Sequence, residues 1–324
     1  MRCKNLICLV VAIAVVFSIG LTSAAAADYP KRPITLICPW GAGGGTDAVS
    51  RIIATLLKKD LGVPVNVVNR TGGSGAVGHT AMATAKPDGY TIGMPTVEIT
   101  MMHWMGLTKI TYQDMTPVAM VNFDPAGINV RTDSPWKTYK DLEMYVRDNP
   151  GKLKDSGTGQ GGIWHLAMAG WMNAIGLSPK AIKWIPSKGA APALQDLMAG
   201  GIEMSTCSLP EAATLIDAGK VRPLAIMASQ KDPNFPEVPT LKELGIDWTC
   251  GAWRGIAAPK GTPKEIIAVL EKAIAKVVKS DDFVKFMKNR GFGIYYLNTA
   301  DFANALAQAD KDNGAIMKAA GITK

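Results

Sequence analysis

Residues Ile34–Asp47 read ITLICPWGAGGGTD, so that a strand-like apolar run, a glycine loop and a helix start follow one another directly. The run Ile34–Cys38 has the length and branching of a buried strand. Apolar residues then recur at three- and four-residue spacing, as on one face of an amphipathic helix, at Val49, Ile52, Ile53, Leu56 and Leu57. The first amides of a helix have no internal acceptor and the helix dipole is positive there, which favours an anion as ligand. A tight turn without a ligand is the alternative, and this stretch alone leaves both open.

The N-terminus has the pattern of a secretory signal peptide. Arg2 and Lys4 precede an apolar segment from Leu6 to Leu21, and the alanines that end at Ala27 offer an A-x-A cleavage site. A retained membrane anchor is the weaker interpretation, because the segment is short for a spanning helix. We therefore expect residues 1–27 to be removed near Ala27 and the mature chain to be exported to the periplasm.

Composition and charge bound the class of protein. A chain of 324 residues with 48% apolar content predicts two domains with packed cores. The formal charge of +8 becomes about +6 without the two signal-peptide cations, and the basic residues are scattered, which argues against nucleic-acid binding. Outside the signal peptide the cysteines are Cys38, Cys207 and Cys250. Their odd number and the lack of C-x-x-C spacing argue against a disulfide framework and a zinc site, while one unassigned disulfide stays open.

Strands and helices alternate after the opening stretch. Val63–Val68 and Tyr90–Met94 are predicted strands with a short helix, Ala76–Ala85, between them. This alternation indicates a parallel, right-handed sheet with ligands beyond the carboxyl ends of its strands. Gly73–Gly78 matches G-x-G-x-x-G, but this fingerprint belongs on the first strand of a dinucleotide-binding unit, so we expect no nucleotide cofactor.

A second glycine loop, Gly157–Gly162, repeats the opening pattern. A short strand precedes it and a helix is predicted from Ile163 onwards. The loop is therefore a second candidate anion site.

The predicted elements suggest where the domains begin and end. An extended run from Met120 to Val130 is the predicted first crossing, and amphipathic helices close the chain far from its start. We therefore expect a discontinuous first α/β domain of residues 28–125 and 228–324, and a second α/β domain of residues 126–227. Two T-x-x-E patterns, at Thr240 and Thr262, predict further helix starts.

The order of short motifs along the mature chain resembles one family. The motifs are Arg32–Ile37 with Pro39–Gly44 and Asp47, Val68–Arg70 with Gly72 and Gly73, Pro87–Thr91, Gly157–Gly159 with His165 and Leu166, Lys188–Leu194, Ala218–Arg222, Pro236–Thr240, and Ala258–Pro263. Together they resemble the Bug-type solute-binding proteins of tripartite tricarboxylate transporters. The resemblance implies a type II periplasmic binding protein-like fold, in which two α/β domains close over a small carboxylate that is then delivered to membrane permease subunits.

The resemblance also implies which residues hold the ligand. In the family, backbone amides and ordered water of the first glycine loop hold the carboxylate, with help from the facing domain. Carried over by position, the candidates are Trp40, Gly41, Ala42, Gly43 and Asp47 in the first loop, Gly73 and Ser74 in the second segment, Thr96 after the third strand, Thr158 and Gly159 in the facing domain, and Cys207.

Three positions depart from the family pattern and leave the ligand open among di- and tricarboxylates, aromatic acids and amino acids. Trp40 replaces a smaller aromatic residue, Gln160 replaces a serine, and Cys207 lies near where an acidic or polar residue faces an amino-acid ligand. We expect Trp40 to form a wall of the pocket rather than to stack on a ring. We expect Asp47 to cap its helix rather than to hold a ligand amine, because a carboxylate beside a bound carboxylate would be repulsive.

No enzyme motif is complete in this sequence. The segment around Ser74 lacks the last glycine of G-x-S-x-G, and His79, His103 and His165 lack metal-binding spacing. We therefore expect a monomeric, non-enzymatic receptor without a metal or a cofactor, which closes by a hinge motion. The alternatives are the ligand-binding component of a sensing system and, less favoured, a secreted carboxylate-processing enzyme.

Overall fold

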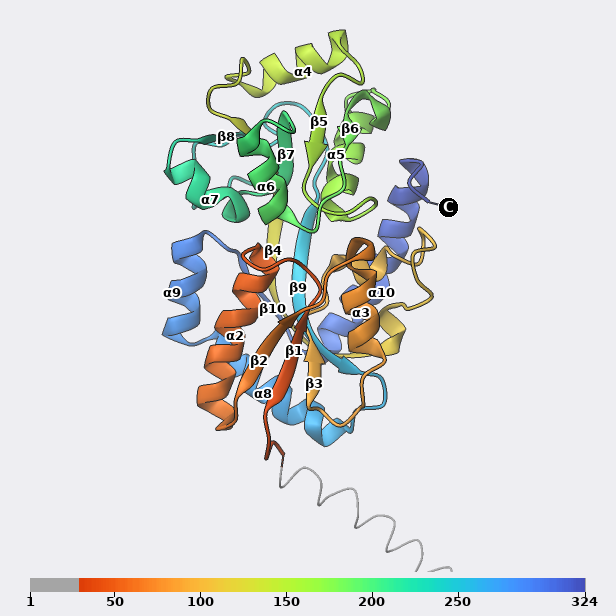
Figure 1. The fold of residues 1–324 in the computed structure, drawn as a ribbon, viewed down its shortest axis with the longest axis vertical. Coiled ribbons are helices and arrows are strands. Elements are labelled where there is room, and N and C mark those ends of the chain that lie inside the picture. Colours follow the sequence, from red (N-terminus) through yellow and green to blue (C-terminus); the bar gives the residue numbers. More distant parts are fainter. Residues whose placement is uncertain (1–28, 324) are drawn as a thin grey trace, which may run out of the picture.

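The computed structural model describes residues 29–323, so the predicted signal peptide lies outside the described residues. The described strands form one ten-stranded sheet that passes through two parts of the molecule (Figure 1). We call the part with β1–β3, β9, β10, α2, α3 and α8–α10 the lower part, and the part with β5–β8 and α4–α7 the upper part. Strand β4 belongs to both.

The lower part begins with the predicted strand, loop and helix. Its first elements are β1 (Ile34–Cys38), α2 (Gly45–Leu61), β2 (Val65–Asn69), η1 (Gly73–Gly75), α3 (Ala76–Ala83), β3 (Thr91–Gly93), η2 (Val97–Thr100) and η3 (Tyr112–Asp114). The strands are parallel in the order β2-β1-β3, which confirms the predicted parallel sheet. The loops after β1 and β3 therefore open at the same edge of this sheet.

The upper part repeats this design. Its elements are α4 (Tyr139–Asp148), β5 (Lys154–Ser156), α5 (Ile163–Ala174), η4 (Pro179–Ala181), β6 (Lys183–Trp184), α6 (Ala190–Ala199), β7 (Met204–Ser208), α7 (Leu209–Asp217) and β8 (Val221–Ile226). Strand β5 lies between β6 and β7 and is parallel to both. The second glycine loop leaves β5 and enters α5, as predicted.

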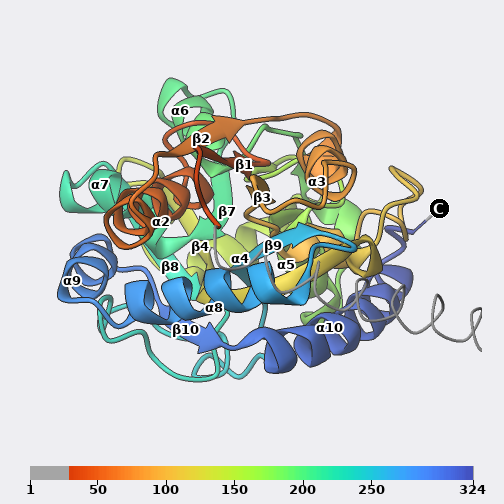
Figure 2. The same ribbon diagram turned by 90° about the horizontal axis from the view of Figure 1, so that it is seen from below.

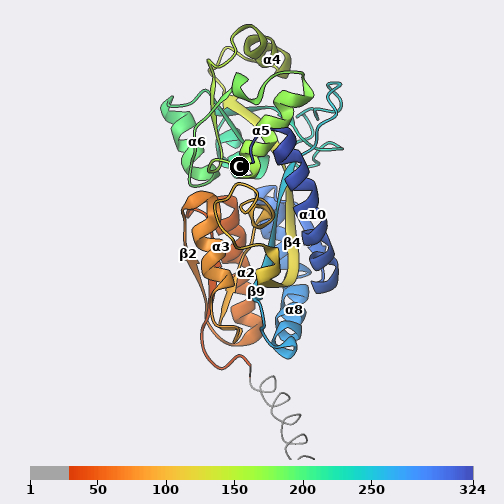
Figure 3. The same ribbon diagram turned by 90° about the vertical axis from the view of Figure 1, so that its right-hand side faces the viewer.

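Strand β4 (Met115–Arg131) links the two parts (Figure 3). It pairs with β9 (Gly251–Pro259) as far as Pro125, and with β7 from Ala126 onwards. The returning chain crosses beside it, because the Ala126 N–H donates to the Cys250 carbonyl at 2.9 Å and the Met227 N–H donates to the Ala126 carbonyl at 2.7 Å. Two adjacent segments therefore make the connection between the parts.

The last quarter of the chain returns to the lower part. After β9, which lies between β3 and β4, come α8 (Lys264–Val278), α9 (Asp281–Arg290), β10 (Ile294–Leu297) and α10 (Thr299–Ala319). Figure 2 shows α8 and α10 along one side of the lower part and α2 and α3 on the other. Strand β1 contributes Ile34 and Leu36 to a fully buried core with Leu57 of α2 and Leu270 of α8. Each such side chain contributes about 1.5–3 kcal/mol of burial free energy.

Of the two predicted T-x-x-E helix starts, the one at Thr240 is wrong, whereas a helix does begin after Thr262, one residue later than predicted. Thr240 and Glu243 make the reciprocal capping bonds, but the segment is only a turn, because Gly245 ends it with φ of 82°. Helix α8 begins at Lys264 without a capping side chain, since the Thr262 hydroxyl donates to the Pro259 carbonyl instead.

Candidate functional site

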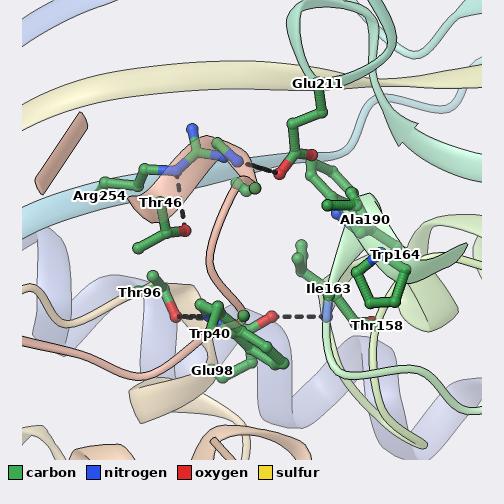
Figure 4. Close-up of a pocket in the computed structure, with 17 residues that line it drawn as sticks. Trp40, Thr46, Thr96, Glu98, Thr158, Ile163, Trp164, Ala190, Glu211 and Arg254 are labelled. Atoms are coloured by element: carbon green, nitrogen blue, oxygen red, sulfur yellow. Dashed lines mark hydrogen bonds and ion pairs between the residues drawn. The ribbon is translucent and has the colours of Figure 1, made fainter. Parts of the chain in front are cut away.

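A small pocket lies where the loops of the two parts meet (Figure 4). Its volume is about 20 Å³, enough for about one water molecule. The N-termini of three helices, α2, α5 and α6, line it. The lining residues are Trp40, Gly41, Gly44, Gly45, Thr46, Thr96, Glu98, Ala252 and Arg254 from the lower part, and Thr158, Ile163, Trp164, Gly189, Ala190, Ala191, Pro192 and Glu211 from the upper part.

Glu98 connects the lower part to the N-terminus of α5. One carboxylate oxygen, Oε1, accepts the N–H of Ile163, the first residue of α5, at 3.0 Å. The other, Oε2, accepts the Thr96 hydroxyl at 2.5 Å. The side chain is buried, and this burial raises the pKa of Glu98.

A short network fixes Thr96, and through it Glu98. His79 Nδ1 lies 2.8 Å from the Gly75 carbonyl, and its Nε2 accepts the Thr96 N–H at 3.1 Å, which assigns a neutral ring with the proton on Nδ1. Burial agrees with this assignment, because it lowers the pKa of His79 to about 4. The Trp40 Nε1–H donates to the Thr96 hydroxyl at 3.0 Å. Trp40 is thereby held as a wall of the pocket.

Glu211 makes the reciprocal connection from the upper part to the N-terminus of α2. Its Oε1 accepts the N–H of Gly45, the first residue of α2, and an N–H of Arg254, both at 3.3 Å. Its Oε2 accepts the Ser208 hydroxyl at 3.1 Å and the Ser208 N–H at 3.3 Å. Burial raises the pKa of Glu211. All four contacts are longer than the usual hydrogen bond of about 2.9 Å.

Arg254 of β9 is the buried cation of the site. Its Nε donates to the Thr46 hydroxyl at 3.1 Å, and its Nη1 donates to Asp124 and Asn122. The guanidinium is only 2% exposed, and Asp124 is 1% exposed. Because Asp124 and Glu211 both pair with Arg254, this cation is already neutralised by the protein's own carboxylates.

Thr158 and the α6 N-terminus present unused polar groups to the pocket. The Thr158 hydroxyl is buried and has no hydrogen-bond partner among the described residues. Ala190 and Ala191 are the first residues of α6, and within residues 29–323 their N–H groups donate to no protein acceptor. These are the groups to which a small anion could be bound without displacing a protein side chain.

The residues expected from sequence are only partly brought together. Trp40, Gly41, Thr96 and Thr158 line the pocket. The first loop's amides are engaged within the protein, however, because the Gly41 N–H donates to the Lys188 carbonyl at 3.2 Å and the Gly43 N–H to Asp47 at 3.0 Å.

Asp47 lies in the first turn of α2 but makes no side-chain cap of this helix, and its carboxylate accepts the N–H of Gly43, which precedes the N-cap. It is the third residue of α2, whose N-cap is Gly44, and it also pairs with Arg51 and accepts from Asn69. Ala42, Gly43 and Asp47 therefore shape the loop without lining the pocket.

The remaining expected residues lie beside the pocket. The Ser74 hydroxyl donates to the Gln160 carbonyl at 2.8 Å across the two parts, and Gly159 packs directly against Ser74. Gly73 precedes this contact in η1. The Cys207 thiol is buried in β7, where Asn129 and Ser205 donate to its sulfur, and it does not line the pocket. Cys38, Cys207 and Cys250 are all free thiols.

Sequence reasoning missed Glu98, Glu211 and Arg254. Two of them leave a local signal: Ser208 with Glu211 forms an S-x-x-E helix start, and Arg254 is a charge inside an apolar strand, where charged residues are rarely buried unless paired. Glu98 has no such signal, because its partner Ile163 is 65 positions away.

The described part of the chain has neither a candidate metal site nor a candidate membrane-spanning helix. Residues 29–323 contain no group of three or more His, Cys, Asp and Glu side chains that could hold a metal ion. No helix within the same residues is both long and apolar enough to cross a membrane.

Comparison with known proteins gives one consistent family. Residues 49–322 match the model of the tripartite tricarboxylate transporter family receptor. A TctC solute-binding protein from Polaromonas, solved with no ligand, is 38% identical over 90% of this chain and 99% of its own, with a TM-score of 0.66. The periplasmic binding protein BugD is 30% identical over 91% and 100%, with a TM-score of 0.86. A protein of R. palustris solved with adipate is 29% identical over 91% and 99%, also with a TM-score of 0.86.

Proposed function

The chain belongs to the TctC, or Bug-type, family of solute receptors, which are binding proteins and not enzymes, and we propose that it captures a small carboxylate in the pocket between its two parts. It then delivers this ligand to membrane permease subunits of a tripartite tricarboxylate-type transporter. The adipate in the R. palustris relative supports a carboxylate as the ligand class.

One observation carries the proposal. The N-termini of α2, α5 and α6 converge on one pocket that draws residues from both parts, and the Thr158 hydroxyl inside it has no partner among the described residues. Protein carboxylates already accept from the N-termini of α2 and α5, so the α6 N-terminus and the Thr158 hydroxyl are the groups that favour a ligand anion. A carboxylate fits this set, because each of its oxygens accepts two hydrogen bonds.

We further propose that residues 28–125 with 228–324 and residues 126–227 are domains that move about the two crossing segments. The pocket of about 20 Å³ is too small for a carboxylate ligand, so binding requires the parts to separate and close again. The Polaromonas relative supports this motion, since its TM-score is lower than that of BugD although its sequence identity is higher. If sequence divergence alone set the structural difference, the Polaromonas relative would have the higher TM-score of the two.

We propose that the mature chain starts near Asp28 after cleavage of the signal peptide and works as a periplasmic monomer. The pattern of Arg2, Lys4 and the apolar segment up to Leu21 supports export. BugD is named a periplasmic binding protein, which supports the same compartment.

A thermal-shift screen of the purified mature chain tests the ligand class. Mono-, di- and tricarboxylates, aromatic acids and amino acids are compared with matched primary amides, which lack the charge. We expect at least one acid to raise the melting temperature, by linkage, while its amide does not. Stabilisation by no acid, or by acid and amide alike, contradicts the proposal. Conversion of a bound acid into product would show an enzyme instead.

A further inference from the structure

Glu98 and Glu211 occupy two of the three helix N-termini that face the pocket. Glu98 accepts the first N–H of α5 and Glu211 accepts the first N–H of α2, each from the opposite part (Figure 4). Only the N-terminus of α6, at Ala190 and Ala191, is left without a protein carboxylate. The Thr158 hydroxyl, which has no partner among the described residues, lines the same pocket, so this part of the pocket suits one ligand carboxylate.

The two glutamates differ in how firmly they are held. The contacts of Glu98 are 2.5 and 3.0 Å, whereas those of Glu211 are 3.1 to 3.3 Å. Long, shared hydrogen bonds are weak, and the contacts to Gly45 and Arg254 cross between the parts and must lengthen when these separate. In the closed form all four acceptor positions of Glu211 are used, and those of Oε1 become free for a ligand where the parts separate and the bonds to Gly45 and Arg254 are lost.

The charges around Glu211 disfavour a second ligand carboxylate there. The charged groups here are the buried Arg254 with one positive charge, the buried carboxyl groups of Asp124 and Glu98, and the carboxyl group of Glu211, whose side chain is 6% exposed. Arg254 is already paired with two of them. A second ligand carboxylate at the α2 N-terminus would lie against Glu211 without a free cation, and like charges held together away from water cost several kcal/mol.

Building on the proposed function, we propose that Glu211 is a specificity-determining residue. It selects a ligand that carries one carboxylate and, at the other end, a hydrogen-bond donor such as an ammonium or hydroxyl group. The carboxylate binds Thr158 and the α6 N-terminus, and the donor binds the carboxylate of Glu211. A dicarboxylate is disfavoured, in contrast to the relative solved with adipate.

Titration calorimetry on the mature chain at pH 7 tests this inference with matched ligands. The probes are α,ω-dicarboxylates of four to six carbons and the ω-amino and ω-hydroxy acids of the same chain lengths. For at least one length, we expect the amino or hydroxy acid to bind the wild type at least about tenfold more tightly than the dicarboxylate. Glu211→Gln keeps the shape but removes the charge, so this ratio is expected to shrink to about threefold or to reverse. The control Glu237→Gln, at an exposed loop position, leaves it unchanged.

The outcomes separate this inference from the proposed function. Carboxylate binding by the wild type without a preference for the donor-bearing acids overturns the role of Glu211 but leaves the receptor function intact. A preference that persists unchanged in Glu211→Gln also overturns it. Binding of no acid in these series or in the wider screen overturns both. The ligand preference of the wild type is measured without any variant, so the inference can still be tested if Glu211→Gln does not fold.

Discussion

The two glycine loops of this receptor have the same design, but the glutamates that contact them are held by hydrogen bonds of different length. Each loop follows a parallel strand and enters a helix, and the first N–H of each helix is accepted by a glutamate of the opposite part. At the upper loop the glutamate is Glu98, which Thr96 holds at 2.5 Å. At the lower loop it is Glu211, whose contacts are all 3.1 Å or longer.

The difference suggests that one connection orders the pocket while the other responds to the ligand. Glu98 lies at the end of a network through Thr96 to His79 and Trp40, so its position is set by several buried bonds. Glu211 shares its contacts with Arg254, which has Asp124 as a second partner. We expect substitutions at the upper loop to damage stability, and substitutions at the lower loop to change ligand preference instead.

The largest effect is expected at Gly157. A Cβ there would lie 2.0 Å from the Thr206 carbonyl oxygen, which is backbone and cannot move aside, so Gly157→Ala should cost about 3 kcal/mol or more, or prevent folding. At Gly45 the Cβ would meet side-chain atoms of Arg254 and Glu211 at 2.7–2.9 Å, so Gly45→Ala should cost less, about 1–2 kcal/mol. Gly44→Ala, with no atom closer than 3.4 Å, is the control for urea denaturation. Equal stability of all three variants would contradict the proposed rigidity of the upper loop.

Asp155, in the strand that leads into the upper loop, is expected to make stability depend on pH. It is buried, accepts the Thr206 N–H at 2.8 Å, and burial raises its pKa to about 7, whereas the strand before the lower loop has no ionisable carboxyl group. Between pH 4 and pH 7 the native state keeps a proton that the unfolded chain has lost, so stability falls as the pH rises. Asp155→Asn has no carboxyl group at this position and therefore lacks this pH-dependent contribution to the free energy of unfolding.

The stability of Asp155→Asn relative to wild type should therefore increase by about 3 kcal/mol from pH 4 to pH 8. Urea unfolding at pH 4.5, 6 and 8 measures this difference, and other titrating groups cancel from it. Asp148→Asn, at an exposed position of α4, is the control variant. A constant difference across this range would show that Asp155 is ionised throughout.

The two glutamates are expected to differ when each is truncated. Glu98→Ala leaves the Ile163 N–H and the Thr96 hydroxyl without their acceptor, at a cost of about 2 kcal/mol. Glu211→Ala removes four contacts, but all of them are long and Arg254 stays paired with Asp124, so we expect a smaller loss of about 1.5 kcal/mol. Chemical denaturation compares them directly, and a larger loss for Glu211→Ala would reverse the assigned roles.

The smallest effect is expected at Trp40. Trp40→Phe keeps an aromatic wall but loses the Nε1–H bond to Thr96, which should cost about 1 kcal/mol. Trp184→Phe is a matched control, because the Trp184 Nε1–H is buried without a partner in the described structure. Its loss of stability should be the smaller of the two. Ligand affinity should change less than threefold in Trp40→Phe if Trp40 only forms a wall.

The sequence predicts local elements well and contacts between distant segments poorly. The strand, loop and helix units at Ile34 and at Leu153 were recognisable because apolar spacing and glycines act over a few residues. Strands β6 and β10 were missed, since β6 has two residues and β10 is half exposed. Family resemblance supplied the fold and four of the pocket-lining residues.

The charged part of the pocket was missed for a physical reason. Arg254 reaches Thr46 across 208 positions, and no local pattern reports such a contact. Sequence alone also predicted that the first loop's amides face a ligand. In the structure most of them donate to Lys188, Asp47 and Glu211, because the closed parts supply acceptors of their own.

The position of β9 has a consequence for how the chain reaches its native state. This strand comes from residues 251–259 but lies between β3 and β4, which are complete by residue 131. Until it inserts, β3 and β4 both present unpaired edges, and such edges readily pair with other chains. The N-terminal half therefore has no finished sheet of its own, and folding must wait for contacts between distant segments, which slows it. A fragment that ends before Gly251 is expected to aggregate rather than to yield a working half-receptor.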